Sequence, residues 1–225
     1  MFVVTNAFTR TYPGACAGSL VLHGVANPED HPALDQQRVD LEMSLRERYA
    51  GLDRVALKAV PAIQVYNAYY SRFGNTYHVQ LQLESVVGKG RSVARGPALV
   101  QAMFMAELKN LLLTAGHDLA TVHLPVTLDV ATGSETYTLL NGQQKTLKPG
   151  DMFISDQEGI LSSVLYGPDA RTQLRPGTGQ VLYTVYAPAG IGAQAVREHL
   201  RDLAAYVQAV VPAASIVSLE VSRAR

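Results

Sequence analysis

The chain has 225 residues, of which 48% are apolar and 17% are charged, a composition typical of a globular protein that buries a core of its own. Nineteen basic and nineteen acidic side chains cancel, so no overall field draws the chain to nucleic acid or to an anionic membrane. A single cysteine, Cys16, excludes an intrachain disulfide and a thiolate-rich zinc site and favours a reducing cytoplasm. No stretch approaches the ~18 apolar residues of a membrane-spanning helix, and the N-terminus does not have a signal-peptide pattern. No metal site or cofactor is expected.

The N-terminal part predicts two strands and one amphipathic helix. The strands are expected at 2–5 and 19–25; His23, inside the second, has no other ligand at metal-site spacing and is interpreted as an ordinary strand residue. The helix ends at Gly51, and its apolar positions recur at helical spacing: Leu34, Leu41, Leu45 and Tyr49. Its charged face is expected to be solvated: Arg38, Glu42 and Arg46.

The middle of the chain predicts three more helices, at 61–74, 81–87 and 97–113. The first carries a row of tyrosines that is expected in the core, although tyrosines can also stack on bases: Tyr66, Tyr69 and Tyr70. The loop before the third helix, GKGRSVARG, holds the only local basic patch of the sequence: Lys89, Arg91 and Arg95. Side chains of this reach and charge contact phosphates, but a solvated loop fits the same pattern.

The run from Gly133 to Asp156, GSETYTLLNGQQKTLKPGDMFISD, predicts short strands joined by tight turns. Asn141-Gly142 is typical of a two-residue type I′ hairpin turn, because both residues tolerate positive φ. The segment 148–151, KPGD, predicts a second turn, and a further strand is expected at 160–165. A strand at 124–130 precedes the run, and 114–118 is expected to form a loop that contains a helix-ending glycine.

The C-terminal part predicts a strand at 181–187, a helix at 194–211 and a strand at 215–221. The segment 190–195, GIGAQA, matches the G-x-G-x-x-A pattern in which helix N-terminal amides hold a pyrophosphate. This strand–helix–strand unit is the last of the chain, so no further units remain to build a dinucleotide-binding sheet. Nucleotide binding through this motif is therefore kept only as a third functional hypothesis.

Three segments of the 133–156 run resemble one known domain: Gly133-Ser134-Glu135, Leu140-Asn141-Gly142 and Ile154-Ser155-Asp156. Asp118 lies upstream at the spacing of the same family. The chain is similar to the B3/B4 domain, the tRNA-editing domain of the phenylalanyl-tRNA synthetase β subunit, and to stand-alone proteins that contain it. The likeness covers roughly 60–171. It implies an α+β fold with a mostly antiparallel sheet and flanking helices, in one domain over 1–225, with N-terminal strands and a helix at 1–59 and a strand–helix–strand unit at 180–225.

The pocket positions of that family differ more than its scaffold positions. The family's editing-pocket histidine corresponds to Thr114, and an aspartate and an asparagine of the preceding helix correspond to about Gln101 and Phe104. The family's paired glycines correspond to about Val164 and Leu165, and the glutamate that recognises a tyrosine hydroxyl falls near Tyr183 or Thr184. The resemblance therefore implies the scaffold more directly than the chemistry.

Candidate residues follow from these positions and from side-chain chemistry. The catalytic candidates are Thr114, His117 and Ser163. His117-Asp118 is not favoured as a dyad, because adjacent loop residues seldom hydrogen-bond in that way. The candidates for binding a ligand carboxylate or ester are Ser162, Ser163, Arg171 and Thr184. The candidates for binding tRNA are Lys89, Arg91 and Arg95. The residues assigned to the structural motif are Asp118, Gly133, Glu135, Asn141, Gly142 and Asp156.

The resemblance implies a cytoplasmic protein that binds aminoacyl-tRNA and, if active, hydrolyses a mischarged aminoacyl ester in trans. Such a hydrolysis needs a positioned water and dipoles for the developing oxyanion, so the missing histidine does not by itself abolish it. The alternative is a non-catalytic module that binds a small amino-acid-like ligand, which the zero net charge and the apolar pocket replacements favour.

Overall fold

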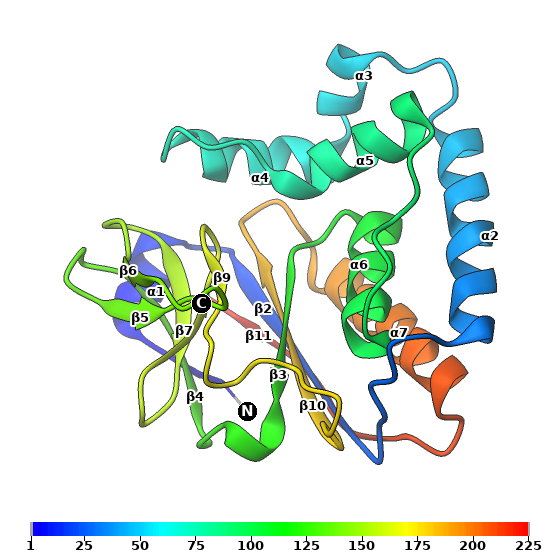
Figure 1. The fold of residues 1–225 in the computed structure, drawn as a ribbon. Helices are drawn as coiled ribbons and strands as arrows, with labels where there is room; N and C mark the ends of the chain where they lie inside the picture. The colour runs from blue at the N-terminus through cyan, green and yellow to red at the C-terminus, as the bar shows by residue number, and fades with distance from the viewer. Residues whose placement is uncertain (1, 225) are drawn as a thin grey trace.

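A computed structural model describes residues 2–224 and places two β-sheets beside a layer of helices (Figure 1). The first sheet has the order β1 (Phe2–Val4), β4 (Val126–Val130), β7 (Met152–Ser155), β8 (Ile160–Ser163), β9 (Gly167–Pro168). The second has the order β11 (Ser215–Arg223), β2 (Cys16–His23), β10 (Gln180–Ala187), β3 (Thr114–Asp118). A separate hairpin contains β5 (Thr136–Thr138) and β6 (Gln144–Thr146). Among these strands only β1 and β4 pair in parallel. The expected α+β class is confirmed, with the antiparallel strands divided between two sheets and a hairpin.

The helices are α1 (Asn6–Thr11), α2 (Pro32–Arg48), α3 (Arg54–Lys58), α4 (Pro61–Ser71), α5 (His78–Lys89), α6 (Ala98–Asn110), α7 (Ala193–Val210) and the 3-10 turn η1 (Leu119–Thr121). Helices α6 and α7 cover one face of the second sheet, and the first sheet packs on its other face (Figure 1). None of the helices within residues 2–224 is long and apolar enough to cross a membrane.

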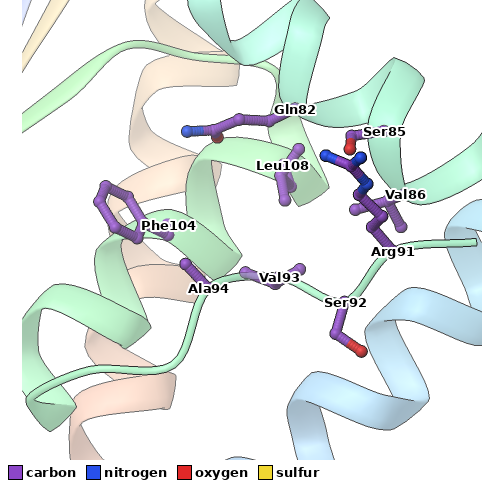
Figure 2. A pocket seen from close by; sticks show the side chains of 9 residues that line it. All are labelled: Gln82, Ser85, Val86, Arg91, Ser92, Val93, Ala94, Phe104 and Leu108. Carbon is purple, nitrogen blue, oxygen red and sulfur yellow. The ribbon is translucent and has the colours of Figure 1, made fainter. Parts of the chain in front are cut away.

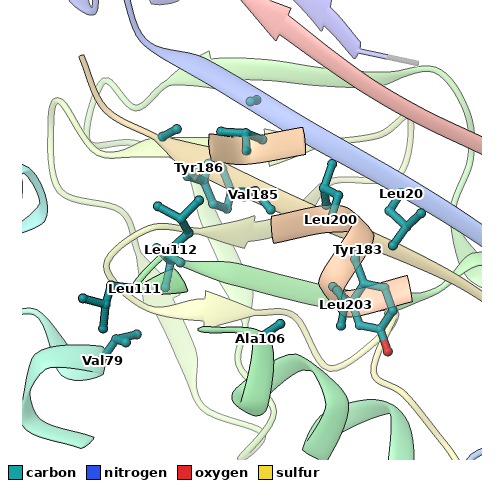
Figure 3. Packing of buried hydrophobic residues seen from close by; sticks show 14 of the residues in the cluster. Leu20, Val79, Ala106, Leu111, Leu112, Tyr183, Val185, Tyr186, Leu200 and Leu203 are labelled. Carbon is teal, nitrogen blue, oxygen red and sulfur yellow. The ribbon is translucent and has the colours of Figure 1, made fainter. Parts of the chain in front are cut away.

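Successive side chains of β10 point to opposite faces of the second sheet, so this strand contributes to the packing on both faces. Tyr183 points to the helices, where its hydroxyl donates to the carbonyl of Leu99 in α6 at 2.8 Å. Tyr186 points to the first sheet, where its hydroxyl lies 2.6 Å from the Ser162 hydroxyl. Figure 3 shows β10 residues of this core beside Leu200 and Leu203 of α7. The tyrosines of α4 are also buried, as expected: Tyr66, Tyr69 and Tyr70.

The last strand–helix–strand unit does not form an adjacent parallel pair. Strands β10 and β11 each pair antiparallel with β2, which lies between them. The GIGAQA segment therefore precedes a helix that crosses over an antiparallel neighbour, and the sheet is not doubly wound. This topology removes the support for a dinucleotide site of that type.

The segment 114–118, expected as a loop, is the buried strand β3. Helix α6 ends at Asn110, and Leu111 takes the left-handed C-cap position with φ 58°, where a glycine was expected to end the helix further along. Gly116 instead makes room between strands, because a Cβ built there would lie 3.0 Å from the Tyr183 ring. Because this edge strand consists of small and polar residues, hydrophobic periodicity does not reveal it.

The charged face of α2, expected to be solvated, is partly buried. Arg38 and Glu42 are each only 4% exposed, and Nη1 of Arg38 lies 2.6 Å from Oε1 of Glu42. The same oxygen accepts a 2.9 Å hydrogen bond from the backbone N–H of Val93. The expectation was wrong because this face packs against the segment after α5, where the carboxylate replaces solvent as the partner of backbone groups.

The hairpin at 136–146 is confirmed, but its predicted turn type is wrong. Gly142 has φ 80°, whereas Leu111 is the one non-glycine residue with positive φ in the described chain, so Asn141 does not adopt the type I′ conformation. The N–H of Gly142 donates to the carbonyl of Leu139 at 2.8 Å, and the Asn141 side chain accepts from the N–H of Gln143 at 3.0 Å. The loop has three residues and ends in a left-handed glycine. The second turn forms as predicted, with the Asp151 N–H bonded to the Lys148 carbonyl at 3.0 Å.

Gly18 of β2 lies where α7 approaches the second sheet most closely. A Cβ built at this position would lie 2.5 Å from Cγ1 of Val196. We expect Gly18→Ala to lower the free energy of unfolding by about 1–3 kcal/mol, because α7 has to shift. Gly177→Ala is the matched control, since nothing lies within 4 Å of its added Cβ. Urea denaturation of both variants checks the prediction; equal stabilities would contradict it.

Candidate functional site

A cavity of about 280 Å³ lies between α5, α6, β3 and the turn from β8 to β9. One wall is apolar and includes Met103, Phe104, Leu113, Val164 and Leu165. The side chains with polar groups that line it are His78, Glu107, Thr114, Ser163, Tyr166 and Tyr186. We call this space the acyl cavity, after the acyl group that we propose as its ligand. It combines an apolar surface with a few polar groups, which is the usual composition of a small-ligand site.

The turn from α6 into β3 places Glu107 and Thr114 together. Leu111 reverses the chain in the left-handed conformation, and the carbonyl of Leu111 accepts a 3.2 Å hydrogen bond from the Tyr77 hydroxyl. Two residues later the N–H of Leu113 donates to the Tyr66 hydroxyl at 3.0 Å. The N–H of Thr114 then donates to Oε1 of Glu107 at 2.8 Å. The end of the helix is thus connected to the start of the strand through a carboxyl group.

Glu107 is 1% exposed and has no cationic partner among the described residues. Burial raises the pKa of its carboxyl to about 8, and the hydrogen bond from the Thr114 backbone opposes this shift. At neutral pH most of the carboxyl is therefore protonated. Glu107 can donate a proton to a group in the acyl cavity.

Thr114 is held from the opposite side by a histidine of α7. Its hydroxyl lies 2.7 Å from Nε2 of His199, and Nδ1 of His199 lies 3.4 Å from the side-chain nitrogen of Asn110. Thr114 and Asn110 thus contact the two ring nitrogens of His199. Burial lowers the pKa of His199 to about 4, so the ring is neutral.

Asp151 lies beneath the Ser163 wall of the acyl cavity and is fully buried. Its Oδ1 accepts a 2.6 Å hydrogen bond from the Tyr69 hydroxyl, while Oδ2 has no hydrogen-bond partner. Burial raises the pKa of the Asp151 carboxyl to about 6, against the nearby hydroxyls of Tyr69 and Ser163, which lower it. The group is thus mostly ionised at pH 7.

A buried hydrogen-bonded chain reaches the cavity from the other direction. Thr172 donates to Asp169, and its hydroxyl lies 2.8 Å from Nδ1 of His117. Nε2 of His117 lies 3.4 Å from the Ser162 hydroxyl, which contacts Tyr186 at 2.6 Å. Burial lowers the pKa of His117 to about 3, so this histidine is a neutral link behind Tyr186.

The structure brings together some of the residues that the sequence nominated. Thr114 and Ser163 both line the acyl cavity. Ser162 and His117 lie one layer behind Tyr186. Thr184 is buried on β10 with a hydroxyl that has no partner, and it is not part of the cavity wall. The pocket-position replacements inferred from the resemblance, Phe104, Val164 and Leu165, do line the cavity.

Arg171, nominated for binding a ligand, is placed away from the acyl cavity. Its Nη1 donates to the carbonyl of Thr121 at 2.6 Å, and its Nη2 lies 2.8 Å from Oδ1 of Asp156. The guanidinium therefore connects the η1 turn to the loop after β7. The nominated basic residues are also outside the cavity: Lys89, Arg91 and Arg95.

The carboxylates of the structural motif bind backbone groups. Glu135 accepts from the N–H groups of Thr132 and Gly133, each at 3.0 Å. Asp156 accepts from three backbone N–H groups: those of His123, Glu158 and Gly159. Asp118 accepts from the Ala120 N–H and from the Thr178 hydroxyl, at 3.1 and 2.8 Å. Gly133 has φ 104° and lies against Pro149.

Sequence reasoning missed Glu107 and Asp151. The sequence around each of them contains a pattern that could have identified it. Glu107 is the one acidic residue of the largely apolar 97–113 stretch and lies between Ala106 and Leu108, and Asp151 stands between a Pro-Gly turn and the strand MFIS. An isolated carboxyl flanked by apolar residues is a candidate for a shifted pKa.

No protein-family model and no curated protein matches the sequence. The fold is similar to a crystal structure of an N-terminal fragment of the phenylalanyl-tRNA synthetase β subunit from Pyrococcus horikoshii, with a TM-score of 0.52 and 13% sequence identity. The match covers 96% of this chain and 50% of that one, so the chain spans about half the length of the structure it resembles. At this identity the likeness concerns the fold alone, and it agrees with the resemblance found in the sequence.

Glu107→Gln should change how the stability of the protein depends on pH. Because the folded-state pKa of about 8 exceeds the ordinary 4.5, the wild type loses stability as the pH rises from 4.5 to 8. The neutral amide keeps the Thr114 hydrogen bond and does not ionise. We expect similar stabilities at pH 4.5 and an advantage for the variant of up to about 4 kcal/mol at pH 8.5.

Chemical denaturation across this pH range measures the effect. Glu47→Gln, at an exposed glutamate of α2, should follow the wild-type curve. If Glu107→Gln follows it as well, the carboxyl of Glu107 ionises normally in the folded protein.

Proposed function

We propose that the chain takes the acyl end of an aminoacyl-tRNA into the acyl cavity and hydrolyses the ester bond. The observation that carries this proposal is a carboxyl group in the cavity wall, Glu107, together with a buried one behind Ser163, Asp151, whose pKa values are raised to about 8 and about 6. Two such groups can act as base and acid at the same pH. The fold likeness supports a tRNA-related substrate.

The proposed reaction uses Asp151 through Ser163 and Glu107 directly. A water molecule attacks the ester carbonyl carbon and gives a proton to the Ser163 hydroxyl, which passes its own proton to the Asp151 carboxylate. The bond between the carbonyl carbon and the ribose oxygen then breaks, and the carboxyl of Glu107 protonates the departing oxygen. Exchange with solvent returns both groups to their starting states, and the products are the amino acid and a free tRNA end.

The apolar wall of the cavity would choose the acyl group. Phe104, Val164 and Leu165 stand where the resemblance places polar residues and glycines, so they narrow the space and remove hydrogen-bonding partners. A cavity of about 280 Å³ with such a wall favours small or medium apolar side chains. One missing methylene changes selectivity by only about 10–200-fold, so we expect preference rather than strict exclusion.

The second candidate function is a module that binds a small amino-acid-like ligand without turnover. Glu107 favours it, because a buried carboxyl that gives up its proton can accept the ammonium group of an amino acid. Zero net charge also favours it, since the chain has no general attraction to nucleic acid. Binding of free amino acids together with an absence of tRNA binding would support this candidate.

Removal of either carboxyl should abolish most of the deacylation. We expect Asp151→Asn and Glu107→Gln each to lower the rate of mischarged aminoacyl-tRNA hydrolysis by about 10²–10⁴-fold. The matched controls are Asp30→Asn and Glu47→Gln, both at exposed positions, which should retain the wild-type rate. The assay follows release of radiolabelled amino acid from tRNAs that are mischarged with tyrosine or with small or medium apolar amino acids. No hydrolysis of any of them by the wild type would contradict the proposal.

The rate should depend on pH with two limbs. Ionisation of Asp151 makes kcat/KM rise as the pH passes about 6, and loss of the Glu107 proton makes it fall above about 8. The residual activity of Glu107→Gln should lack the alkaline limb and keep the acidic limb. A variant profile that keeps both limbs would assign the alkaline limb to another group.

A further inference from the structure

A second cavity of about 260 Å³ lies beside the acyl cavity, between α5, α6 and the segment 91–94 (Figure 2). Its polar lining consists of Gln82, Ser85, Arg91 and Ser92, and its apolar lining includes Val93, Phe104 and Leu108. Phe104 also lines the acyl cavity, so one aromatic ring is common to both spaces. A ligand with two parts could occupy them together.

The segment that carries Arg91 is held by buried charge. Oε1 of Glu42 accepts from the Val93 N–H at 2.9 Å, and Oε2 accepts from the Ser92 hydroxyl at 3.3 Å. Arg46 donates to the carbonyls of Gly90 and Arg91, each at 3.4 Å. The ends of this segment are thus fixed on α2 by side chains, and the segment forms a defined wall of the second cavity.

Two polar groups at this cavity, the Arg91 guanidinium and Oε1 of Gln82, have no partner within residues 2–224. The guanidinium of Arg91 makes no hydrogen bond or ion pair within residues 2–224, whereas Arg95 four residues later lies 3.6 Å from Oδ1 of Asp35. Oε1 of Gln82 is buried without a hydrogen-bond donor. Figure 2 shows the Gln82 amide extending from α5 on the side of Phe104 and Leu108. A buried acceptor without a donor costs free energy that a bound ligand would recover.

We propose that the second cavity binds an adenine nucleotide. A glutamine amide pairs with the amino group and N7 of adenine, an aromatic ring stacks on a base, and a guanidinium binds phosphate. Gln82, Phe104 and Arg91 supply these three groups. The volume lies just below the ~300 Å³ at which pockets for drug-sized ligands begin, so the site accepts one nucleotide rather than a longer segment.

This inference deepens the proposed function and rests on it for the natural ligand. A tRNA ends in an adenosine whose ribose carries the acyl ester, so an adenine in the second cavity would direct the ester past Phe104 into the acyl cavity. The Arg91 guanidinium would bind the phosphate of that terminal nucleotide. The site would then hold the tRNA by its end, which compensates for the absence of an overall positive charge.

Isothermal titration of the full chain with AMP tests the site directly. We expect AMP to bind more tightly than adenosine, and Arg91→Ala to weaken AMP binding by about 5–100-fold, the range of a lost charge-assisted contact. The control is Arg10→Ala, which removes an exposed arginine of α1 and should leave the affinity unchanged. Gln82→Ala should remove the preference for AMP over UMP. Equal binding by the Arg91 and Arg10 variants, or no AMP binding by the wild type at 10 mM, overturns the proposal.

The deacylation assay separates this inference from the proposed function. If AMP binding does not depend on Arg91 and Arg91→Ala hydrolyses aminoacyl-tRNA with the wild-type KM, the nucleotide site is wrong and the hydrolase proposal stands. If AMP binding depends on Arg91 while no aminoacyl-tRNA is hydrolysed, the nucleotide site stands and the hydrolase proposal is wrong.

Discussion

The hydroxyl of Tyr66 is the contact on which the acyl cavity most depends. It donates to the carbonyl of Tyr186 in β10 and accepts from the N–H of Leu113 at the start of β3, so one buried group connects α4 to two strands. The Tyr66 ring stacks on the Tyr77 ring at a centroid distance of 4.3 Å. The Tyr77 hydroxyl donates a hydrogen bond to the Leu111 carbonyl. These two tyrosines fix the reversal between α6 and β3, and that reversal is what brings Glu107 against Thr114.

Glu107 and Asp151 are buried carboxyl groups without cationic partners among the described residues. Such groups are uncommon in a protein core, because burial of an ionised group is unfavourable. Glu107 avoids this by retaining its proton, and Asp151 is stabilised by the Tyr69 hydroxyl. The position that resembles the family's editing histidine is Thr114, yet a histidine is still near it, because His199 reaches Thr114 from α7. The chain thus has a fold similar to that of the synthetase fragment, with its own set of side chains around the cavity.

The sequence predicted the elements whose hydrophobic period is regular and the turns whose residues have special conformations. Helix α7 and the Pro-Gly turn at 149–150 are examples. It failed where tertiary contacts decide: β3 has two small residues and a histidine in place of an apolar alternation, and Arg38 and Glu42 are buried only because the chain after α5 packs on them. Two residues of the cavity, Thr114 and Ser163, were predicted from their sequence positions. Glu107 was not, because its raised pKa depends on burial by residues distant in the sequence.

The hairpin of β5 and β6 has its own small core, in which Tyr137, Leu147 and Phe153 pack together apart from the main cluster. Tyr166 packs on this core and also lines the acyl cavity, and the Tyr137 hydroxyl binds the Gly167 carbonyl at 2.8 Å. A small cluster opens at a lower free energy than a large one. We therefore expect the side of the cavity beside this hairpin to open at a lower free energy than the side formed by α6 and β3, while the main core remains folded.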